Sequence, residues 1–280
     1  MAKRVLITGG ASGLGLALAT RYLQAGHRVL ITDINRARAE EAEFTLRPLG
    51  EVHVQQADIR NQDDWQRLHD WCAEHWGGLD VLINNAGVAS AGRVDNTSVD
   101  DWHWIIDINL LGIVRGLNVL LPMMKRQGSG QVINIASLAA IANAPVMGSY
   151  NVTKSAVVSL SETMRHELSA YGIHTAVVCP GFFQTNLAES LRTSEPGMDQ
   201  TVRKLLAGGS MNAEQVADYI YVQADKRRFL ILPHKEGRLL YRIKRFVPAL
   251  YNREAAKAGR RLKAKLESLR DRVAPKAPVE

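Results

Sequence analysis

The stretch RVLITGGASGLG at residues 4–15 places an apolar, strand-like run directly before a glycine-rich turn. A helical pattern follows from Leu14 to Leu23. At such a turn, free backbone N–H groups and the positive end of the helix dipole face the same point, which favours a bound pyrophosphate. A tight strand-to-helix turn that binds nothing also uses glycine, so that interpretation stays open for this stretch alone.

The residues of this turn have separate expected tasks. A side chain at Gly9 or Gly13 would block the approach of a phosphate, whereas Gly15 would allow the helix to pack closely on the strand. With Ser12 and Leu14, these glycines form the predicted phosphate-binding turn.

Further short apolar runs alternate with helical patterns along the chain. We predict strands at Arg4–Thr8, Arg28–Asp33, Val52–Asp58, Val81–Asn84, Gln131–Ser137, His174–Cys179 and Phe229–Leu232. Most of these runs are continuous in Val, Ile and Leu, which is typical of strands covered on both faces. Right-handed crossovers then predict an α/β fold, a Rossmann-like doubly wound sheet of seven parallel strands with helices on both faces. No linker precedes Pro233, so residues 1–234 are predicted to form one domain.

Asp33 closes the second predicted strand, 20 residues after Gly13. At this distance an acidic side chain accepts hydrogen bonds from the adenosine ribose hydroxyls of a dinucleotide. Its alternative role is to cap the helix that starts near Arg36. An Asp here repels a ribose 2′-phosphate and Ser12 offers no positive charge, so NAD is the favoured cofactor. Arg36 and Arg38 keep NADP open as the alternative.

Two more turns lie at the same carboxyl edge of the predicted sheet. Asp58 and Ile59 end the third strand, and Asn85, Ala86 and Gly87 follow the fourth. Their position favours a part in the dinucleotide site. Asn and Gly also favour turns by themselves, so neither segment decides the function without its neighbours.

Tyr150 and Lys154 are four residues apart in a predicted helix, which places the phenol and the ammonium on one face. A fixed cation about 4 Å from a phenol stabilises the phenolate by about 4 kcal/mol at an effective dielectric near 20. We therefore expect Lys154 to lower the pKa of Tyr150 into the range useful for proton transfer near neutral pH. Ser137 ends the fifth predicted strand, and Asn109 lies in the helical stretch before it.

Together these residues resemble the short-chain dehydrogenase/reductase family. The resemblance covers residues 4 to about 185. It rests on the Thr-Gly-x-x-x-Gly-x-Gly turn from Thr8, the Asn-Asn-Ala-Gly segment from Asn84, the tetrad Asn109, Ser137, Tyr150 and Lys154, and Pro180-Gly181 with Thr185 downstream.

The resemblance implies a role for each of these residues. Tyr150 would exchange the hydroxyl proton while hydride passes between the carbinol carbon and the nicotinamide, and Ser137 would hold the substrate oxygen. Lys154 would bind the nicotinamide ribose, and Asn109 would hold a water that connects Lys154 to solvent. The family also implies that Pro180, Gly181 and Thr185 flank the nicotinamide, and that Asp58 and Ile59 lie at the adenine.

The expected reaction is the reversible conversion of a secondary alcohol to a ketone. Residues 138–147 and an insertion at 182–209 that we interpret as a substrate lid are expected to recognise the substrate. Their apolar side chains favour an apolar, bulky alcohol; they are Leu138, Ile141, Val146, Met147, Phe182, Phe183 and Leu187. The alternatives are an NADPH-dependent ketone reductase and a dinucleotide-binding regulator that does not turn over substrate.

The basic character of the chain belongs to its end. The net charge is +7, but residues 235–280 carry 14 Lys and Arg against 5 Asp and Glu, which leaves residues 1–234 at −2. This distribution does not favour a nucleic-acid partner. Leu and Ile at helical spacing predict basic amphipathic helices in this extension; the apolar positions are Leu239, Leu240, Ile243, Phe246, Val247, Leu250, Leu262, Leu266 and Leu269. Docking on the body or on a second subunit and contact with an anionic membrane surface both remain open.

The remaining features predict a cytoplasmic homodimer or homotetramer, with membrane association through the tail as an alternative. Cys72 and Cys179 do not indicate a disulfide framework, and no signal peptide or spanning segment is expected. No metal site is predicted, because His69 and His75 would lie about 9 Å apart along a helix axis. The five tryptophans are interpreted as packing residues.

Overall fold

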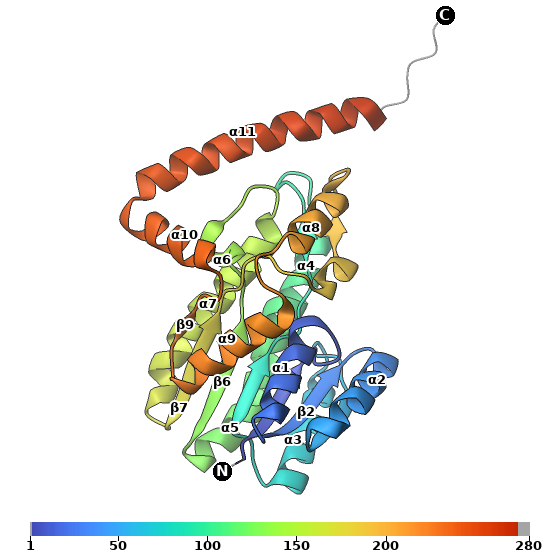
Figure 1. Ribbon diagram of the computed structural model, residues 1–280, viewed down its shortest axis with the longest axis vertical. Helices are drawn as coiled ribbons and strands as arrows, with labels where there is room; N and C mark the ends of the chain where they lie inside the picture. The colour runs from blue at the N-terminus through green and yellow to red at the C-terminus, as the bar shows by residue number, and fades with distance from the viewer. Residues whose placement is uncertain (1, 274–280) are drawn as a thin grey trace, which may run out of the picture.

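The computed structural model describes residues 2–273; the side chains of residues 265, 266 and 269–273, which include the predicted apolar positions Leu266 and Leu269, lie outside the described part. A sheet of seven parallel strands forms the centre of the molecule (Figure 1). In spatial order the strands are β3 (Val52–Gln56), β2 (Arg28–Asp33), β1 (Arg4–Thr8), β4 (Val81–Asn84), β6 (Gly130–Ile135), β7 (Ile173–Val178) and β9 (Leu230–Ile231). The predicted doubly wound fold is confirmed.

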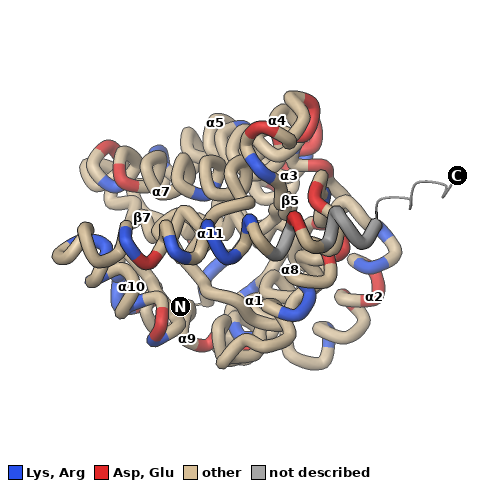
Figure 2. The backbone as a smooth tube through the Cα atoms, turned by 90° about the horizontal axis from the view of Figure 1, so that it is seen from above, with Lys and Arg blue, Asp and Glu red and all other residues tan. Residues whose placement is uncertain are grey.

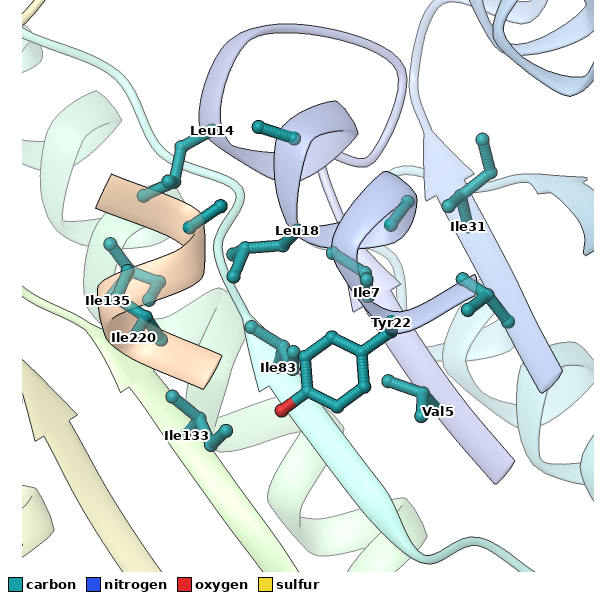
Figure 3. Close-up of a cluster of buried hydrophobic side chains, with 14 of the residues drawn as sticks. Val5, Ile7, Leu14, Leu18, Tyr22, Ile31, Ile83, Ile133, Ile135 and Ile220 are labelled. Carbon is teal, nitrogen blue, oxygen red and sulfur yellow. The ribbon is translucent and has the colours of Figure 1, made fainter. Parts of the chain in front are cut away.

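Helices cover both faces of the sheet because successive strand residues point to opposite sides. One face is covered by α1 (Gly13–Gln24), α2 (Arg36–Leu46) and α9 (Ala213–Asp225), and the other by α3 (Gln62–Trp71), α5 (Gly112–Gln127) and α7 (Gly148–Ser169). In β1, for example, Val5 and Ile7 belong to the first core and Leu6 to the second. Figure 3 shows the first core, in which Leu14 and Leu18 of α1 lie over the isoleucines of the sheet.

Several strands end earlier than the sequence pattern predicts. The third predicted strand, β3, ends at Gln56, and the fifth predicted strand, β6, ends at Ile135. Ala136 still donates a hydrogen bond to the carbonyl of Val178, but the chain then leaves the sheet. The paired residues of β3 end at Gln56 and those of β6 at Ile135, short of the polar residues that close the predicted strands. The predicted site residues Asp58 and Ser137 therefore stand on loops just past the strand ends.

The helical stretch before β6 consists of α4 (Val99–Ile106), a π-helical turn η3 (Asp107–Leu111) and α5. By length and composition alone, the stretch Val99–Gln127 is apolar enough to cross a membrane. In this fold it packs against α3, and Leu117 and Met124 join the core of the second sheet face. We therefore interpret it as a core helix. The short elements η1 (Arg47–Leu49), η2 (Cys72–Trp76) and α6 (Ala139–Ala142) complete the body.

The predicted lid at residues 182–209 contains η4 (Asn186–Ser190), β8 (Arg192–Thr193) and α8 (Met198–Ala207). β8 pairs in parallel with β5 (Ser90–Ala91), a second small sheet that the sequence analysis missed. Strands of two residues are too short to leave a readable hydrophobic period. This pairing ties the predicted lid to the loop after β4.

The predicted basic extension is helical, as α10 (Lys235–Phe246) and α11 (Pro248–Val273). In Figure 1, α11 runs across the end of the molecule that carries α8 and α4. The side chain of Tyr251 bonds the Ala142 carbonyl of α6, and Leu262 packs on the cluster that holds Met198 and Val202 of α8. The tail therefore connects the two walls that were expected to recognise the substrate.

Candidate active site

A cleft of about 530 Å³ opens at the carboxyl edge of the sheet. It collects most of the site residues predicted from the sequence, although these come from segments far apart in the chain. Those that line it are Gly9, Ser12, Gly13, Leu14, Asp33, Asp58, Ile59, Asn85, Ala86, Gly87, Ser137, Tyr150, Lys154, Pro180, Gly181 and Thr185. Of the predicted set, Gly15 and Asn109 do not line the cleft.

The glycine turn has the backbone geometry that its sequence requires. Gly9 and Gly13 have φ of +62° and +51°, in the left-handed region that favours glycine. A Cβ at Gly9 would lie 2.9 Å from Cα of Ala86, and one at Gly15 would collide with the Gly9 carbonyl oxygen. Gly15 therefore serves helix packing. Ser12 precedes α1 without capping it through its side chain, which leaves the amino terminus of α1 facing the cleft. This arrangement fits a dinucleotide pyrophosphate.

Asp33 stands at the end of β2, and its carboxylate accepts from the Asn35 amide at 3.0 Å and the Ala11 amide at 3.4 Å. The cap of α2 is Asn35, whose side chain accepts from the amide of Arg38. Asp33 is therefore free of the capping role that was its alternative. Its carboxylate ties the glycine turn to β2 and lines the cleft.

The two arginines that kept NADP open lie in different places. Arg36 pairs with Glu40 along α2 and does not line the cleft. Arg38 lines the cleft, and its guanidinium pairs with Glu189 of η4 at 2.7 Å. Glu189 belongs to the predicted lid, so this ion pair closes the cleft beside Asp33. Sequence reasoning missed Glu189, because no local pattern links residues 151 positions apart.

Asp58 is held by its neighbour Arg60, whose guanidinium approaches the carboxylate to 2.6 Å. This hydrogen-bonded contact lowers the pKa of Asp58. Both side chains line the same end of the cleft as Asp33, together with Ile59. The charged groups gather at this end.

Tyr150 lies in the first turn of α7, and its side chain is buried in the cleft wall. Burial raises the pKa of the phenol, because the phenolate would lose water, while a hydrogen bond with Ser137 opposes the rise. The expectation that Lys154 lowers this pKa is not met in this structure. The ammonium lies 5.9 Å from the centre of the phenol ring and donates to the Ile135 carbonyl at 3.0 Å instead.

Lys154 is itself 5% exposed, and burial lowers the pKa of its ammonium to about 8. Asn109, in the π-helical turn, is fully buried and bonds both backbone groups of Val88. A Cβ at Gly87 would lie 3.0 Å from Oδ1 of Asn109 and 3.3 Å from Nζ of Lys154. The absence of a side chain at Gly87 thus allows the amide and the ammonium to approach the same loop.

The loop after β7 carries Pro180 and Gly181 at the cleft. The Gly181 amide donates to Nδ1 of His234 at 3.0 Å, and His234 is 4% exposed. Burial lowers the pKa of this imidazole. His234 is a residue that sequence reasoning missed. A lone histidine before a basic helix gives no signal, since its partner lies 53 residues away.

The other end of the cleft is apolar. It is lined by Val88, Ala89, Trp104, Ile108, Leu138, Ala142, Met147, Phe182, Phe183, Leu187, Leu191, Val202 and Leu206. The interpretation of Trp104 as a packing residue was wrong, because Trp104 forms part of this wall. The Arg192 guanidinium lies 4.0 Å from its ring centre. Ile141 and Val146 were expected at the substrate but do not line the cleft. The spacing of Trp104 and Ile108, one helical turn apart and just before Asn109, was the available signal.

A sequence model of the short chain dehydrogenase family matches residues 3–196, which is more than half of the chain. The chain belongs to the short-chain dehydrogenase family. The match includes every predicted site residue, and it ends within the predicted lid, before α8 and the basic tail. As a short-chain dehydrogenase, the protein is an NAD(P)-dependent oxidoreductase that acts on alcohol and ketone groups.

Among curated relatives, this short-chain dehydrogenase is 32% identical over 229 residues to 2-(R)-hydroxypropyl-CoM dehydrogenase of Xanthobacter autotrophicus, covering 79% of this chain and 90% of the relative. It is 28% identical to the NADP-dependent (R)-specific alcohol dehydrogenase of Lentilactobacillus kefiri, covering 81% and 91%. A short-chain dehydrogenase from Burkholderia phymatum, solved in complex with NAD, is 30% identical with a TM-score of 0.84, covering 89% of this chain and 95% of that one.

Proposed function

We propose that this enzyme interconverts an apolar secondary alcohol and its ketone with NAD, and that Tyr150 is the acid/base. The observation that carries the assignment is that Tyr150 and Ser137 both line the cleft that also holds the glycine turn. The same cleft thus holds a turn that fits a dinucleotide and, in Tyr150 and Ser137, side chains suited to proton transfer. A bound nicotinamide supplies the hydride acceptor, or the donor in the reverse direction.

The protein residues then manage the proton and the substrate oxygen. Ser137 donates to the carbonyl or hydroxyl oxygen and orients it toward the phenol. Tyr150 removes the hydroxyl proton during oxidation and returns it during reduction. Burial raises the pKa of the phenol in this structure, so Tyr150 is neutral and can donate its proton to a ketone oxygen. In the oxidation direction the ionised phenolate accepts the hydroxyl proton.

Lys154 and Asn109 form the proposed proton route behind the phenol. The ammonium of Lys154 is anchored on the Ile135 carbonyl, within the fold rather than at the surface. A pKa of about 8 lets this group exchange a proton near neutral pH. Asn109 holds the Val88 loop next to Lys154, and we propose that it also positions the water that leads to solvent.

NAD is the proposed cofactor, with Asp33 as the acceptor for the adenosine ribose. The Asp33 carboxylate repels a 2′-phosphate. Both arginines at this end of the cleft are already paired, Arg38 with Glu189 and Arg60 with Asp58. Asp58 and Ile59 are proposed to lie at the adenine, and Pro180, Gly181 and Thr185 at the nicotinamide. The cofactor preference is supported by this charge arrangement.

The substrate is proposed to be uncharged and apolar at its reacting end. Among the described residues that line the cleft, the charged side chains other than Lys154 gather at the adenosine end; they are Asp33, Arg38, Asp58, Arg60 and Glu189. A carboxylate or phosphate beside Tyr150 would therefore have no arginine to neutralise it. The segment 182–209 is proposed as the lid over this end, in a catalytic domain formed by residues 1–234.

A second candidate is an NADPH-dependent ketone reductase, which Arg38 favours by its place in the cleft. Release of Arg38 from Glu189 would let the guanidinium meet a 2′-phosphate. We also propose a homodimer or homotetramer in the cytoplasm, with membrane contact through the tail.

A turnover screen tests the proposed function. The full chain is incubated with a panel of secondary alcohols and ketones of increasing size, and absorbance of the reduced nicotinamide is followed with NAD and NADP. We expect NAD-dependent oxidation of apolar alcohols, and loss of turnover with unchanged cofactor affinity in Tyr150→Phe. Equal turnover in the variant would contradict the assignment of Tyr150.

A further inference from the structure

The outer side of the tail carries large apolar side chains that are exposed among the residues the structure describes. Phe246 is 74% exposed and Leu239 is 60% exposed, on one side of α10 two helical turns apart. Val247 and Leu250 extend this surface around the corner between α10 and α11. We call these four residues the corner patch.

Docking on the body does not explain the corner patch, because the opposite side of the tail makes that contact. Gly237 is buried beside Leu138, and Tyr241 packs on the second core. Lys244 donates to the Ile141 carbonyl at 2.6 Å. The tail is therefore already seated, and the corner patch faces away from the body.

Exposed arginines lie beside the corner patch on α10 and farther along α11. Arg242 and Arg245 are exposed on α10, and Arg260 and Arg261 are exposed on α11. In the part of the chain that the structure describes, the ion pairs of the tail involve other residues than these four. Figure 2 shows Lys and Arg along α10 and α11 with few acidic residues between them.

A second copy of the chain fits this surface poorly. A two-fold contact would bring the same patch from both copies together, so Arg242 and Arg245 of each would meet like charges. A partner that is negatively charged at its surface and apolar beneath satisfies both features of the tail.

We propose that the corner patch and its arginines form a docking surface for an anionic lipid bilayer. Phe246 and Leu239 enter the boundary between headgroups and acyl chains, and the guanidinium groups remain at the level of the lipid phosphates. The acidic residues oppose this weakly: Glu236 is the one acid in α10, and Glu254 is paired with Lys257 at 2.8 Å.

Docking in this way gives the enzyme a defined orientation. α11 leads from the corner patch across the end of the molecule where the apolar half of the cleft lies, with Tyr251 on α6 and Leu262 on the α8 cluster (Figures 1 and 2). The substrate end of the cleft is then held near the bilayer, and the phosphate-binding turn lies deeper in the body.

Flotation of the full chain with vesicles tests the proposal. We expect binding to vesicles of equal parts phosphatidylcholine and phosphatidylserine, little binding to phosphatidylcholine alone, and weaker binding at about 0.5 M salt. Phe246→Ser combined with Leu239→Ser should lower the bound fraction by about fivefold or more. Arg242→Glu with Arg245→Glu should do the same.

Matched variants separate the tail from general surface effects. Phe44 is 79% exposed on α2, so Phe44→Ser removes a comparable side chain from another face, and Arg126→Glu reverses an exposed charge on α5. Both should bind vesicles as the wild type does. Failure of the wild type to bind anionic vesicles, or equal loss in the control variants, would overturn the proposal.

Two further measurements make the outcome unambiguous. Light scattering after size-exclusion chromatography would reveal whether Phe246→Ser dissociates a dimer. Dissociation of a dimer by this substitution, in a wild type that does not bind vesicles, would assign the patch to self-association and refute the proposal. Turnover of a water-soluble secondary alcohol should be unchanged in Phe246→Ser, since Phe246 does not line the cleft. Membrane docking and the proposed reaction can therefore fail independently.

Discussion

Nδ1 of His234 accepts a hydrogen bond of 3.0 Å from the backbone amide of Gly181, which joins the start of the basic tail to the loop proposed to flank the nicotinamide. A Cβ at Gly181 would lie 3.1 Å from the imidazole, so the loop and the ring are in direct contact. Accepting this bond requires an unprotonated Nδ1. Burial lowers the pKa of His234, which keeps the ring neutral, while Glu236 and Arg238 act on it in opposite directions.

The first prediction concerns His234 as a positioning residue. His234→Ala leaves the Gly181 amide without its acceptor, and should lower the free energy of unfolding by about 1–3 kcal/mol and reduce kcat more than it raises KM. His234→Asn places an oxygen near the position of Nδ1 and should restore most of the loss. Equal kcat in the two variants would show that the hydrogen bond does not matter.

The same bond has a pH dependence. The folded-state pKa of His234 lies below its unfolded value, so the stabilisation is complete above the unfolded value of 6.5 and is lost as the pH falls through the folded value. The Tm of the wild type should therefore drop more below pH ~6 than that of His234→Asn, as thermal denaturation at several pH values would measure.

The second prediction concerns the stability cost of Lys154. Its pKa falls from 10.5 to about 8 on burial, so the folded protein is stabilised by this group above pH 10.5 and loses that contribution as the pH falls through 8. Lys154→Met should abolish turnover yet gain up to roughly 3 kcal/mol relative to the wild type at pH 7, with the gain shrinking toward pH 10. A Tm difference that does not vary with pH would refute the buried charge.

The third prediction concerns cofactor choice. Asp33→Ala should lower the ratio of kcat/KM for NAD over NADP by about 10- to 100-fold, since it removes an acceptor and a repelling charge. Glu189→Gln should raise NADP use by releasing Arg38. Arg36→Ala is the control, because Arg36 lies outside the cleft lining. A wild type that already prefers NADP would contradict the NAD assignment.

The fourth prediction concerns Trp104 and substrate size. Arg192 stacks on the Trp104 ring at 4.0 Å and pairs with Asp101 at 3.2 Å, which fixes the ring from the predicted lid. Trp104→Leu should lower kcat/KM for bulky apolar alcohols by about tenfold and for small ones much less. Trp102→Leu is the matched control, as Trp102 does not line the cleft. A loss independent of substrate size would remove Trp104 from the substrate site.

The fifth prediction concerns two truncations of the tail. Deletion of residues 253–280 should keep turnover of small alcohols, because every proposed catalytic residue precedes Pro180, but should raise KM for bulky ones by removing Leu262 from the α8 cluster. Deletion from residue 238 also removes Tyr241 from the second core and should lower solubility or change the oligomeric state, as light scattering would detect. An active and unaltered oligomer after the longer deletion would refute the packing role of α10.

The sequence alone predicted the sheet and most of the cleft. Continuous apolar runs identify strands such as β1 and β6, because burial on both faces leaves a local signature. The glycine turn is determined in the same local way: Gly9 and Gly13 have positive φ, and a Cβ at Gly15 would collide with the Gly9 carbonyl of the same turn. The carboxyl ends of parallel strands lie at one edge of the sheet, so the topology alone predicts that Asp33, Ser137 and Tyr150 lie close together.

The tertiary structure alone decided how the two ends of the cleft are closed. Trp104 became a wall residue through contact with Arg192, Arg38 became engaged through Glu189, and His234 became buried through Gly181. Each of these pairs joins residues separated by 53 or more positions, and no periodicity encodes such a pairing. The same reason explains why the tail has an inner and an outer side that the sequence did not distinguish. The amphipathic pattern of the tail predicts an apolar face. Only the packing of α10 on α6 determines which of its apolar side chains remain exposed.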